Sequence, residues 1–307
     1  MRIFLTGAHG MVGRNLLRHP GFAKHEILSP SHAELDLTSA AQVTSFLQEH
    51  KPDFIVNAAG RVGGIQANIK NPVAFLVDNI DINRNVILGA YKAGIKHLLN
   101  LGSSCMYPRE APNPLRESLI LHGELEPTNE GYALAKIMAQ RLCQYVMKEA
   151  PGFMYKTLIP CNLYGPYDKF NLENSHLIPA AILKIHNAKY TSSPVEVWGD
   201  GEARREFMYV EDLNDCIVRG IENFESLPNL MNVGIGSDYS INEYYKAVAE
   251  VVGYSGPFKH DLTKPVGMRK KLVSTKLATE WGWTSKYTLT TGLKRTYDYY
   301  LQLEKAK

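Results

Sequence analysis

The sequence is poor in cysteine, carries little excess charge and lacks long apolar runs. Its cysteines are Cys105, Cys143, Cys161 and Cys216. They are far apart and form no CxxC pair, which argues against a disulfide framework and a metal site. The 34 Lys and Arg against 31 Asp and Glu leave a net charge of +3, too small to indicate a nucleic-acid-binding protein. Because neither a membrane span nor a signal peptide is recognisable, we expect a cytoplasmic protein that binds no nucleic acid and no membrane.

The first half of the chain alternates short apolar segments with longer amphipathic ones. Strands are predicted at 3–5, 27–28, 54–56, 97–101 and 156–160. Helices are predicted between them at 11–18, 40–49, 78–93 and 132–148. Fully apolar strands that alternate with amphipathic helices are typical of an α/β fold. The expected architecture is a doubly wound parallel sheet of the Rossmann type with helices on both faces.

The pattern changes after Pro160, and the 307 residues are enough for about two domains. Residues 162–174 predict a loop, because they are rich in Tyr, Gly, Pro, Asp and Asn. Strands are predicted at 195–198, 207–210 and 231–233, and helices at 175–188, 211–223, 241–252 and 289–303. We predict a dinucleotide-binding domain of residues 1–165, to which part of the segment 195–235 also belongs. Residues 166–194 and 236–307 would form a smaller α+β substrate domain.

Three glycines follow the first predicted strand in a GxxGxxG pattern: Gly7, Gly10 and Gly13, with Met11 and Val12 between the last two. Between a strand and a helix, such a turn lets backbone N–H groups approach the pyrophosphate of a dinucleotide. A purely structural turn is the alternative. An acidic residue ending the second strand would favour NAD(H), but residues 29–32 read Ser-Pro-Ser-His.

His9, Arg14 and His32 are instead suited to a 2′-phosphate. They favour NADP(H), although NAD(H) is not excluded. Asp36, next to Leu37, is expected at the adenine edge rather than at the ribose.

Tyr132 and Lys136 are four residues apart on a predicted helix, so their side chains share one face. We expect the ammonium to lower the pKa of the phenol, which could then act as an acid toward a ketone that is being reduced. Ser103 follows a predicted strand at the sheet edge where ligands bind in such folds. Considered alone, Tyr132 and Lys136 could be an ordinary pair on a helix surface, and Ser103 could be an ordinary loop residue. Together with the glycine turn, they indicate a short-chain reductase.

Longer segments extend this interpretation. They are 61–65 (RVGGI), 102–108 (GSSCMYP), 126–129 (EPTN), 132–136 (YALAK), 162–166 (NLYGP), 174–179 (NSHLIP), 198–201 (WGDG), 205–207 (REF) and 232–234 (NVG). In these segments the chain resembles the extended short-chain dehydrogenase/reductase family and, within it, the GDP-L-fucose synthase family. The members of that family are bifunctional epimerase/reductases of GDP-4-keto-6-deoxy-D-mannose. The resemblance covers nearly the whole chain, but 264–271 departs from the family's Lys-Pro-Asp-Gly form at Val266 and Met268.

The resemblance implies that Ser103, Tyr132 and Lys136 carry an NADPH-dependent reduction at C4. It also implies that Cys105 and His176 carry the epimerisation at C3 and C5. Both carbons are α to the ketone, so their protons are acidified, and a thiol and an imidazole can exchange them near neutral pH. A buried apolar cysteine and a helix-capping histidine are the alternatives for these two residues.

The resemblance also implies further contacts. The cofactor would be bound by Ala58, Ala59, Gly60, Asn79, Leu101, Pro160, Leu163 and His176 in addition to the glycine turn. The GDP-linked keto-deoxy sugar would be bound by Ser104, Cys105, Asn162, Lys184, Trp198, Arg205 and Lys270. The helices at 78–93 and 132–148 would pair with their copies in a homodimer.

Three other functions stay open. One is a GDP-L-colitose synthase that inverts only C5 of a 3,6-dideoxy sugar. Another is a C4 reductase of a GDP-6-deoxy-hexose or GDP-heptose without epimerisation. The last is a dinucleotide sensor without catalysis.

Overall fold

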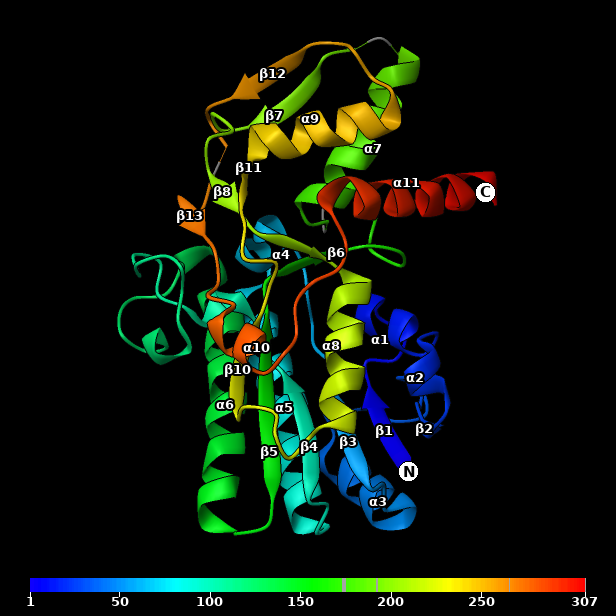
Figure 1. The fold of residues 1–307 in the computed structure, drawn as a ribbon, viewed down its shortest axis with the longest axis vertical. Coiled ribbons are helices and arrows are strands. Elements are labelled where there is room, and N and C mark those ends of the chain that lie inside the picture. The colour runs from blue at the N-terminus through cyan, green and yellow to red at the C-terminus, as the bar shows by residue number, and fades with distance from the viewer. Residues whose placement is uncertain (173–174, 192, 265, 307) are drawn as a thin grey trace.

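The computed structural model describes residues 1–172, 175–191, 193–264 and 266–306. Asn174 of the NSHLIP segment and Pro265 of the 264–271 segment lie outside the described residues. A six-stranded, fully parallel sheet forms the centre of the larger part, in the order β10-β5-β4-β3-β1-β2 (Figure 1). Its strands are β1 (Arg2–Thr6), β2 (Glu26–Leu28), β3 (Phe54–Asn57), β4 (His97–Leu101), β5 (Met154–Pro160) and β10 (Leu230–Val233). The predicted doubly wound sheet is therefore confirmed.

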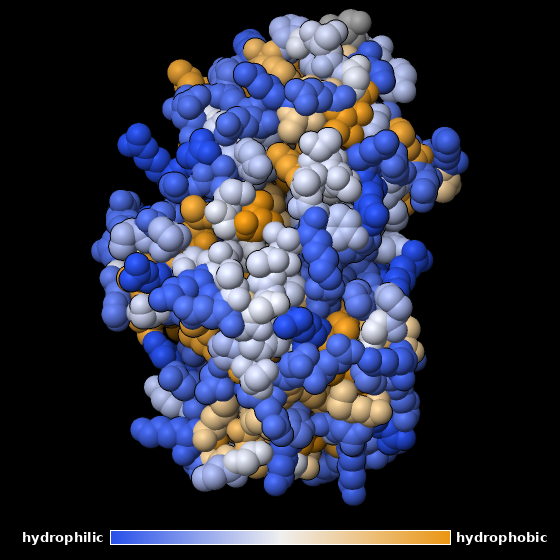
Figure 2. All heavy atoms as spheres, in the orientation of Figure 1, coloured by the Kyte–Doolittle hydropathy of each residue, from blue (hydrophilic) through white to orange (hydrophobic). Residues whose placement is uncertain are grey.

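Helices cover both faces of this sheet, as apolar strands require. One layer contains α3 (Ala40–His50), α5 (Pro72–Lys92) and α6 (Glu130–Glu149), with α5 packed against both neighbours. The other contains α1 (Met11–Leu16) packed on α8 (Val210–Glu222). Alternate residues of β1 face the two layers: Ile3 and Leu5 join one core, and Phe4 joins the other. Hydrophilic residues cover most of the face seen in Figure 2, so these cores lie beneath it.

The smaller part lies beyond the carboxyl ends of the strands and has its own apolar core. It contains α7 (Leu177–Thr191), α9 (Ile241–Val252) and α11 (Leu289–Lys305), with α9 against both other helices. Short strands complete it: β7 (Val195–Trp198) with β12 (Phe258–Asp261), and β11 (Tyr239–Ser240) with β8 (Arg204–Arg205) and β13 (Lys270–Lys271). The remaining helices are α2 (Pro20–Ala23), α4 (Ile65–Lys70) and α10 (Lys276–Glu280).

Two predicted elements differ from the structure by more than a few residues at their ends. The helix predicted at 78–93 begins six residues earlier, because Pro72 occupies a first helical position that suits proline. The loop predicted at 162–174 begins with a strand, β6 (Asn162–Tyr164), which pairs in parallel with β9 (Phe207–Tyr209). This pairing depends on a segment more than 40 residues away, which local composition does not reveal.

Within residues 195–235, α8 and β10 belong to the larger part and β7 pairs with β12 in the smaller part. The division into two domains stays a prediction. In the described part of the chain, no helix is both long enough and apolar enough to cross a membrane.

Candidate active site

A cavity of about 1310 Å³ runs along the carboxyl edge of the large sheet and continues to the smaller part. It is lined by residues from both parts, from the glycine turn after β1 to Trp198 in β7. This is the edge at which doubly wound sheets bind their ligands. Most residues singled out in the sequence line this cavity.

The turn between β1 and α1 can be built only with glycine at two positions. Gly7 has a φ of 70°, and a Cβ there would lie 2.8 Å from the backbone O of Ala58 and the N of Ala59. A Cβ on Gly13 would lie 2.4 Å from the O of Gly7, so α1 could not pack so close to the turn. The turn therefore exposes backbone to the cavity through Gly7, His9, Gly10, Met11 and Val12, while Gly13 lies behind it. Such a cradle fits a dinucleotide pyrophosphate.

The end of the cavity next to β2 has the composition expected for a 2′-phosphate. It is lined by His9, Arg14 and His32, and Leu37 also borders it. Asp36 lines it too, but its Oδ1 accepts hydrogen bonds from the N and Oγ1 of Thr38 at 2.9 and 2.8 Å. Its carboxylate is thereby engaged in a local turn, and its Oδ1 also lies 4.0 Å from the Nδ1 of His32. Two imidazoles and a guanidinium line this end of the cavity.

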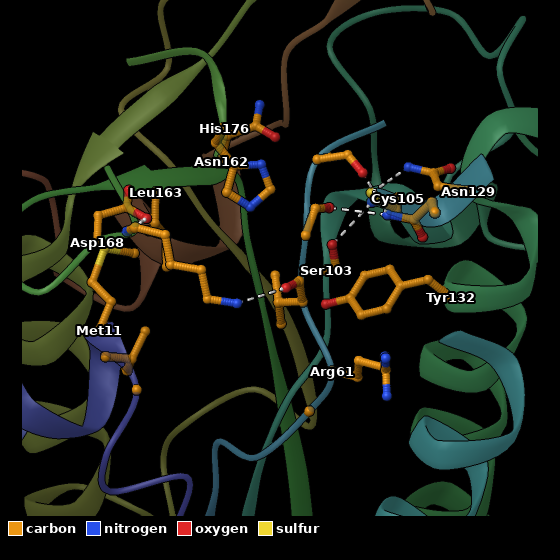
Figure 3. A pocket seen from close by; sticks show the side chains of 18 of the residues that line it. Met11, Arg61, Ser103, Cys105, Asn129, Tyr132, Asn162, Leu163, Asp168 and His176 are labelled. Atoms are coloured by element: carbon orange, nitrogen blue, oxygen red, sulfur yellow. Dashed lines mark hydrogen bonds between the residues drawn. The ribbon is translucent and has the colours of Figure 1, made fainter. Parts of the chain in front are cut away.

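Ser103, Tyr132 and Lys136 meet where β4 ends against α6. Figure 3 shows the Tyr132 hydroxyl directed toward Ser103. The Nζ of Lys136 donates to the O of Leu101 at 2.8 Å and lies 5.9 Å from the centre of the Tyr132 ring. Burial lowers the pKa of Lys136 to about 8. The structure therefore brings together the predicted reductase residues.

The predicted lowering of the Tyr132 pKa is not found. Burial raises this pKa well above its usual value, nearby Cys105 raises it further, and the hydrogen bond with Ser103 only partly opposes the rise. The ammonium of Lys136 is directed to a backbone carbonyl instead of the phenol oxygen. The phenol is thus protonated at neutral pH, which is the form an acid needs.

Cys105 lies just after Ser103, in the 3₁₀ helix Ser104–Met106, and faces the cavity. Its Sγ is 3.1 Å from the Nδ2 of Asn129 and 3.7 Å from the Nζ of Lys271 (Figure 3 shows the Asn129 contact). The other cysteines, Cys143, Cys161 and Cys216, are buried in the apolar cores, where burial raises their pKa values. Cys105 is therefore set apart from them by two polar donors at its sulfur.

His176 precedes α7 and lines the same cavity from the smaller part, beside Asn162 in Figure 3. Burial lowers its pKa to about 4, and the charges of Lys271 and Lys169 act in the same direction. The imidazole is therefore neutral at pH 7. Lys271 therefore contributes to the lowered pKa of His176 and also contacts the Sγ of Cys105.

The expected substrate residues fall into two groups. Asn162, Lys184, Trp198 and Arg205 line the cavity. Ser104 and Lys270 are not among the lining residues. Ser104 is buried, and the Nζ of Lys270 lies 3.1 Å from the Oδ2 of Asp238. Side chains alternate along β13, so the cation that borders the cavity is Lys271 rather than its neighbour.

Among the expected cofactor residues, Ala58, Ala59, Gly60, Leu101, Pro160 and Leu163 line the cavity and Asn79 does not. Asn79 is fully buried and its Oδ1 accepts a hydrogen bond from the N of Arg61 at 2.9 Å, so it supports the loop behind the cavity wall. Asp168 lines the cavity near Leu163 and Met11 (Figure 3), although no motif in the sequence indicates it. Burial raises its pKa to about 7.

Comparison with known proteins agrees with this geometry. The profile of the "NAD dependent epimerase/dehydratase family" matches residues 3–234, more than half of the chain. The chain belongs to this family. It is 55% identical over 302 residues to the GDP-L-colitose synthase of Yersinia pseudotuberculosis, covering 98% of each chain. It is 47% identical over 301 residues to the GDP-L-fucose synthase of Azorhizobium caulinodans, covering 98% of this chain and 96% of that one.

A solved structure of similar shape belongs to a protein with related chemistry. It is the GDP-mannoheptose C4 reductase MlghC from Campylobacter jejuni with NADP bound. It has a TM-score of 0.87, 30% sequence identity and 98% coverage of both chains. The resemblance to extended short-chain reductases inferred from the sequence is thereby confirmed.

Proposed function

We propose that the protein converts GDP-4-keto-6-deoxy-D-mannose to GDP-L-fucose by epimerisation at C3 and C5 and NADPH-dependent reduction at C4. One observation carries this proposal: Cys105 and His176 line the same cavity as Ser103, Tyr132 and Lys136. A plain reductase has no need of a thiol and a neutral imidazole beside its phenol. The fucose synthases among the relatives support the same substrate.

The cofactor would lie along the sheet edge. The glycine turn would hold its pyrophosphate, and His9, Arg14 and His32 would hold the 2′-phosphate. Lys136, Pro160 and Leu163 would border the reactive ring. When bound, NADPH supplies a hydride for C4 of the sugar. The structure of the GDP-mannoheptose C4 reductase with NADP bound supports this choice of cofactor.

In the first stage, the chain exchanges protons at the carbons next to the ketone. Tyr132 and Ser103 donate hydrogen bonds to the C4 oxygen, which stabilises the enolate formed when a neighbouring C–H bond breaks. One of Cys105 and His176 then removes the proton from one face of the sugar, and the other donates a proton of its own to the opposite face. Inversion requires this separation, because one group acting alone would return the proton to the face it came from.

In the second stage, Tyr132 gives its proton to the C4 oxygen as the carbonyl is reduced. The raised pKa keeps this proton on the phenol until negative charge develops on the substrate oxygen. Lys136, buried beneath the ring, stabilises the phenolate left behind. Arg205 supplies positive charge that the GDP diphosphate needs.

A second candidate is the GDP-L-colitose synthase reaction, in which only C5 inverts before reduction. Two observations favour it: the 55% identity to the Yersinia enzyme, and Val266 on the cavity wall at a position where the fucose synthase pattern has Asp. An apolar side chain there suits a sugar that lacks one hydroxyl.

The test offers GDP-4-keto-6-deoxy-D-mannose and its 3-deoxy analogue, each with NADPH or NADH, and identifies the products by NMR. We expect GDP-L-fucose from the first sugar, with NADPH as the better reductant. Turnover of the 3-deoxy sugar alone would establish the second candidate instead. No oxidation of NADPH with either sugar would overturn both.

We also propose that the protein is a homodimer. Large apolar side chains are exposed along α5 and α6: Val73, Val77, Leu134 and Tyr145. A solvent-facing series of this kind is typical of a surface covered by a second copy. The cytoplasmic location stays a prediction from the sequence.

A further inference from the structure

The cavity extends well beyond the catalytic residues along α7. His176 lies just before this helix, and Leu177, Ala180 and Lys184 line the cavity at the spacing of one helix face. At 1.5 Å per residue, Lys184 lies about 10 Å farther along the helix than Leu177. If the sugar ring lies at Ser103 and Tyr132, as the proposed function requires, the far end of α7 faces the nucleotide half of the substrate.

This far end contains an aromatic ring and cations. Its cavity wall includes the carboxylate of Glu196, whereas Asp261, in register with Trp198, lies outside the lining. The Nζ atoms of Lys184 and Lys264 lie 5.3 and 5.8 Å from the centre of the Trp198 ring. Glu196 and Trp198 are two residues apart in β7 and share one face, while Val195 and Val197 are buried on the other. Figure 1 shows β7 at the end of the molecule opposite the base of the large sheet.

The carboxylate of Glu196 is held beside this ring. Its Oε1 accepts a hydrogen bond from the Nε1 of Trp198 at 2.8 Å and lies 3.9 Å from the Nζ of Lys184. Both contacts use the same oxygen, so the carboxylate keeps acceptor capacity for a ligand. The other acidic residues lining the described part of the cavity are Asp36, Asp78, Glu126 and Asp168. These lie on other elements, away from β7.

A carboxylate at the base end of a nucleotide site discriminates among bases. Guanine presents two neighbouring donors, N1–H and the N2 amino group, which match the two oxygens of a carboxylate. Adenine, cytosine and uracil each present an acceptor next to their donor, and that acceptor would face negative charge. Hydrogen bonds to an ionised acceptor are also stronger than neutral ones.

We infer that Glu196 determines the base specificity of the enzyme by accepting hydrogen bonds from N1–H and the N2 amino group of guanine. The inference rests on the proposed function for the direction in which the substrate lies. Trp198 both orients the carboxylate and offers its ring to the base. Glu196 is thus a specificity residue and takes no part in the chemistry at the sugar.

The test measures binding of GDP, IDP and ADP by calorimetry with saturating NADPH, because IDP differs from GDP only in lacking the N2 amino group. We expect the unmodified protein to prefer GDP over IDP by about tenfold, the effect of one good bidentate contact. In Glu196→Gln, GDP binding should weaken about tenfold and the preference over IDP should fall to within about twofold. The preference of this variant for GDP over ADP should also become smaller.

Glu250→Gln, an exposed change on α9 outside the cavity lining, is the matched control and should keep the original preference. Unaltered NADPH binding by Glu196→Gln would show that its fold is intact. The inference is overturned if Glu196→Gln keeps the GDP affinity and the GDP-to-IDP ratio of the unmodified protein, or if that protein binds IDP as tightly as GDP. Failure of the proposed function would be seen separately, as no turnover of the keto-sugar by the unmodified protein.

Discussion

The Nζ of Lys271 lies 3.7 Å from the Sγ of Cys105, although 166 positions separate the two residues in the chain. The contact exists because β13 pairs with β8 and directs Lys271 into the cavity while Lys270 pairs with Asp238. An ammonium at this distance stabilises negative charge that forms on the sulfur while a proton is exchanged. The same ammonium also acts on His176.

Lys271→Met should therefore slow proton exchange at C3 and C5 more than it slows reduction at C4. We expect a loss of about tenfold or more in exchange, as for removal of one charge next to a reacting group. Exchange is measured as deuterium uptake by the sugar in deuterated water, and reduction as NADPH oxidation. Lys271→Arg should restore part of the exchange.

Lys270→Met is the matched control, because it removes the neighbouring positive charge outside the cavity. It should leave the ratio of exchange to reduction unchanged. Equal effects of the two lysine substitutions would show that the contact between Lys271 and Cys105 has no role of its own.

Tyr132→Phe should reduce the rate of C4 reduction by at least about 100-fold, the usual contribution of a positioned acid. The substitution removes one hydroxyl from a ring that lines the cavity and leaves the glycine turn untouched. NADPH binding, followed by fluorescence, should stay close to that of the unmodified protein. Preserved turnover would mean that another group supplies the proton.

The lowered pKa of His176 predicts a loss of stability in acid. Between an unfolded pKa of about 6.5 and the folded value of about 4, the unfolded chain binds a proton that the native protein does not. The free energy of unfolding should therefore fall as the pH drops through this range, by up to about 2 kcal/mol between pH 7.5 and 5.

His176→Gln should remove this part of the pH dependence, as measured by urea unfolding at the two pH values. His122→Gln, an exposed change, should keep it. If all three proteins lost stability in parallel, His176 would not be buried in its neutral form.

The homodimer proposal predicts that charge on α5 separates the subunits. Val73 and Val77 are 72% and 44% exposed and lie one helical turn apart. Val73→Glu combined with Val77→Glu should give monomers in light scattering at micromolar concentration. Leu262→Glu, which changes an equally exposed side chain on the smaller part, should leave the dimer intact. A monomeric unmodified protein would contradict the proposal directly.

Local patterns were enough to predict much of the fold and site. The strand, glycine turn and helix around Gly7 and Gly13 follow from residues that are close in sequence, and so does the pair of Tyr132 and Lys136 on one helix. Family-like segments indicated Cys105 and His176, which the fold places on one cavity.

What local patterns miss depends on contacts between distant segments. β6 forms only by pairing with β9, and the entry of Lys271 into the cavity depends on the register of β13 against β8. Neighbouring side chains of a strand point to opposite sides, which distinguishes Lys271 from Lys270. This distinction could not be predicted because the two-residue strand β13 was not predicted. The predicted direction of the Tyr132 pKa shift was wrong for a similar reason. The shift depends on the burial of the phenol in the folded chain, which local sequence does not reveal.

The most direct test of the two-stage account is the product made by Cys105→Ser from GDP-4-keto-6-deoxy-D-mannose and NADPH in deuterated water. The account predicts a sugar reduced at C4 that keeps its original configuration and has little deuterium at C3 and C5. A fully inverted, deuterated product at the normal rate would contradict it, because the proton would then be exchanged without the thiol.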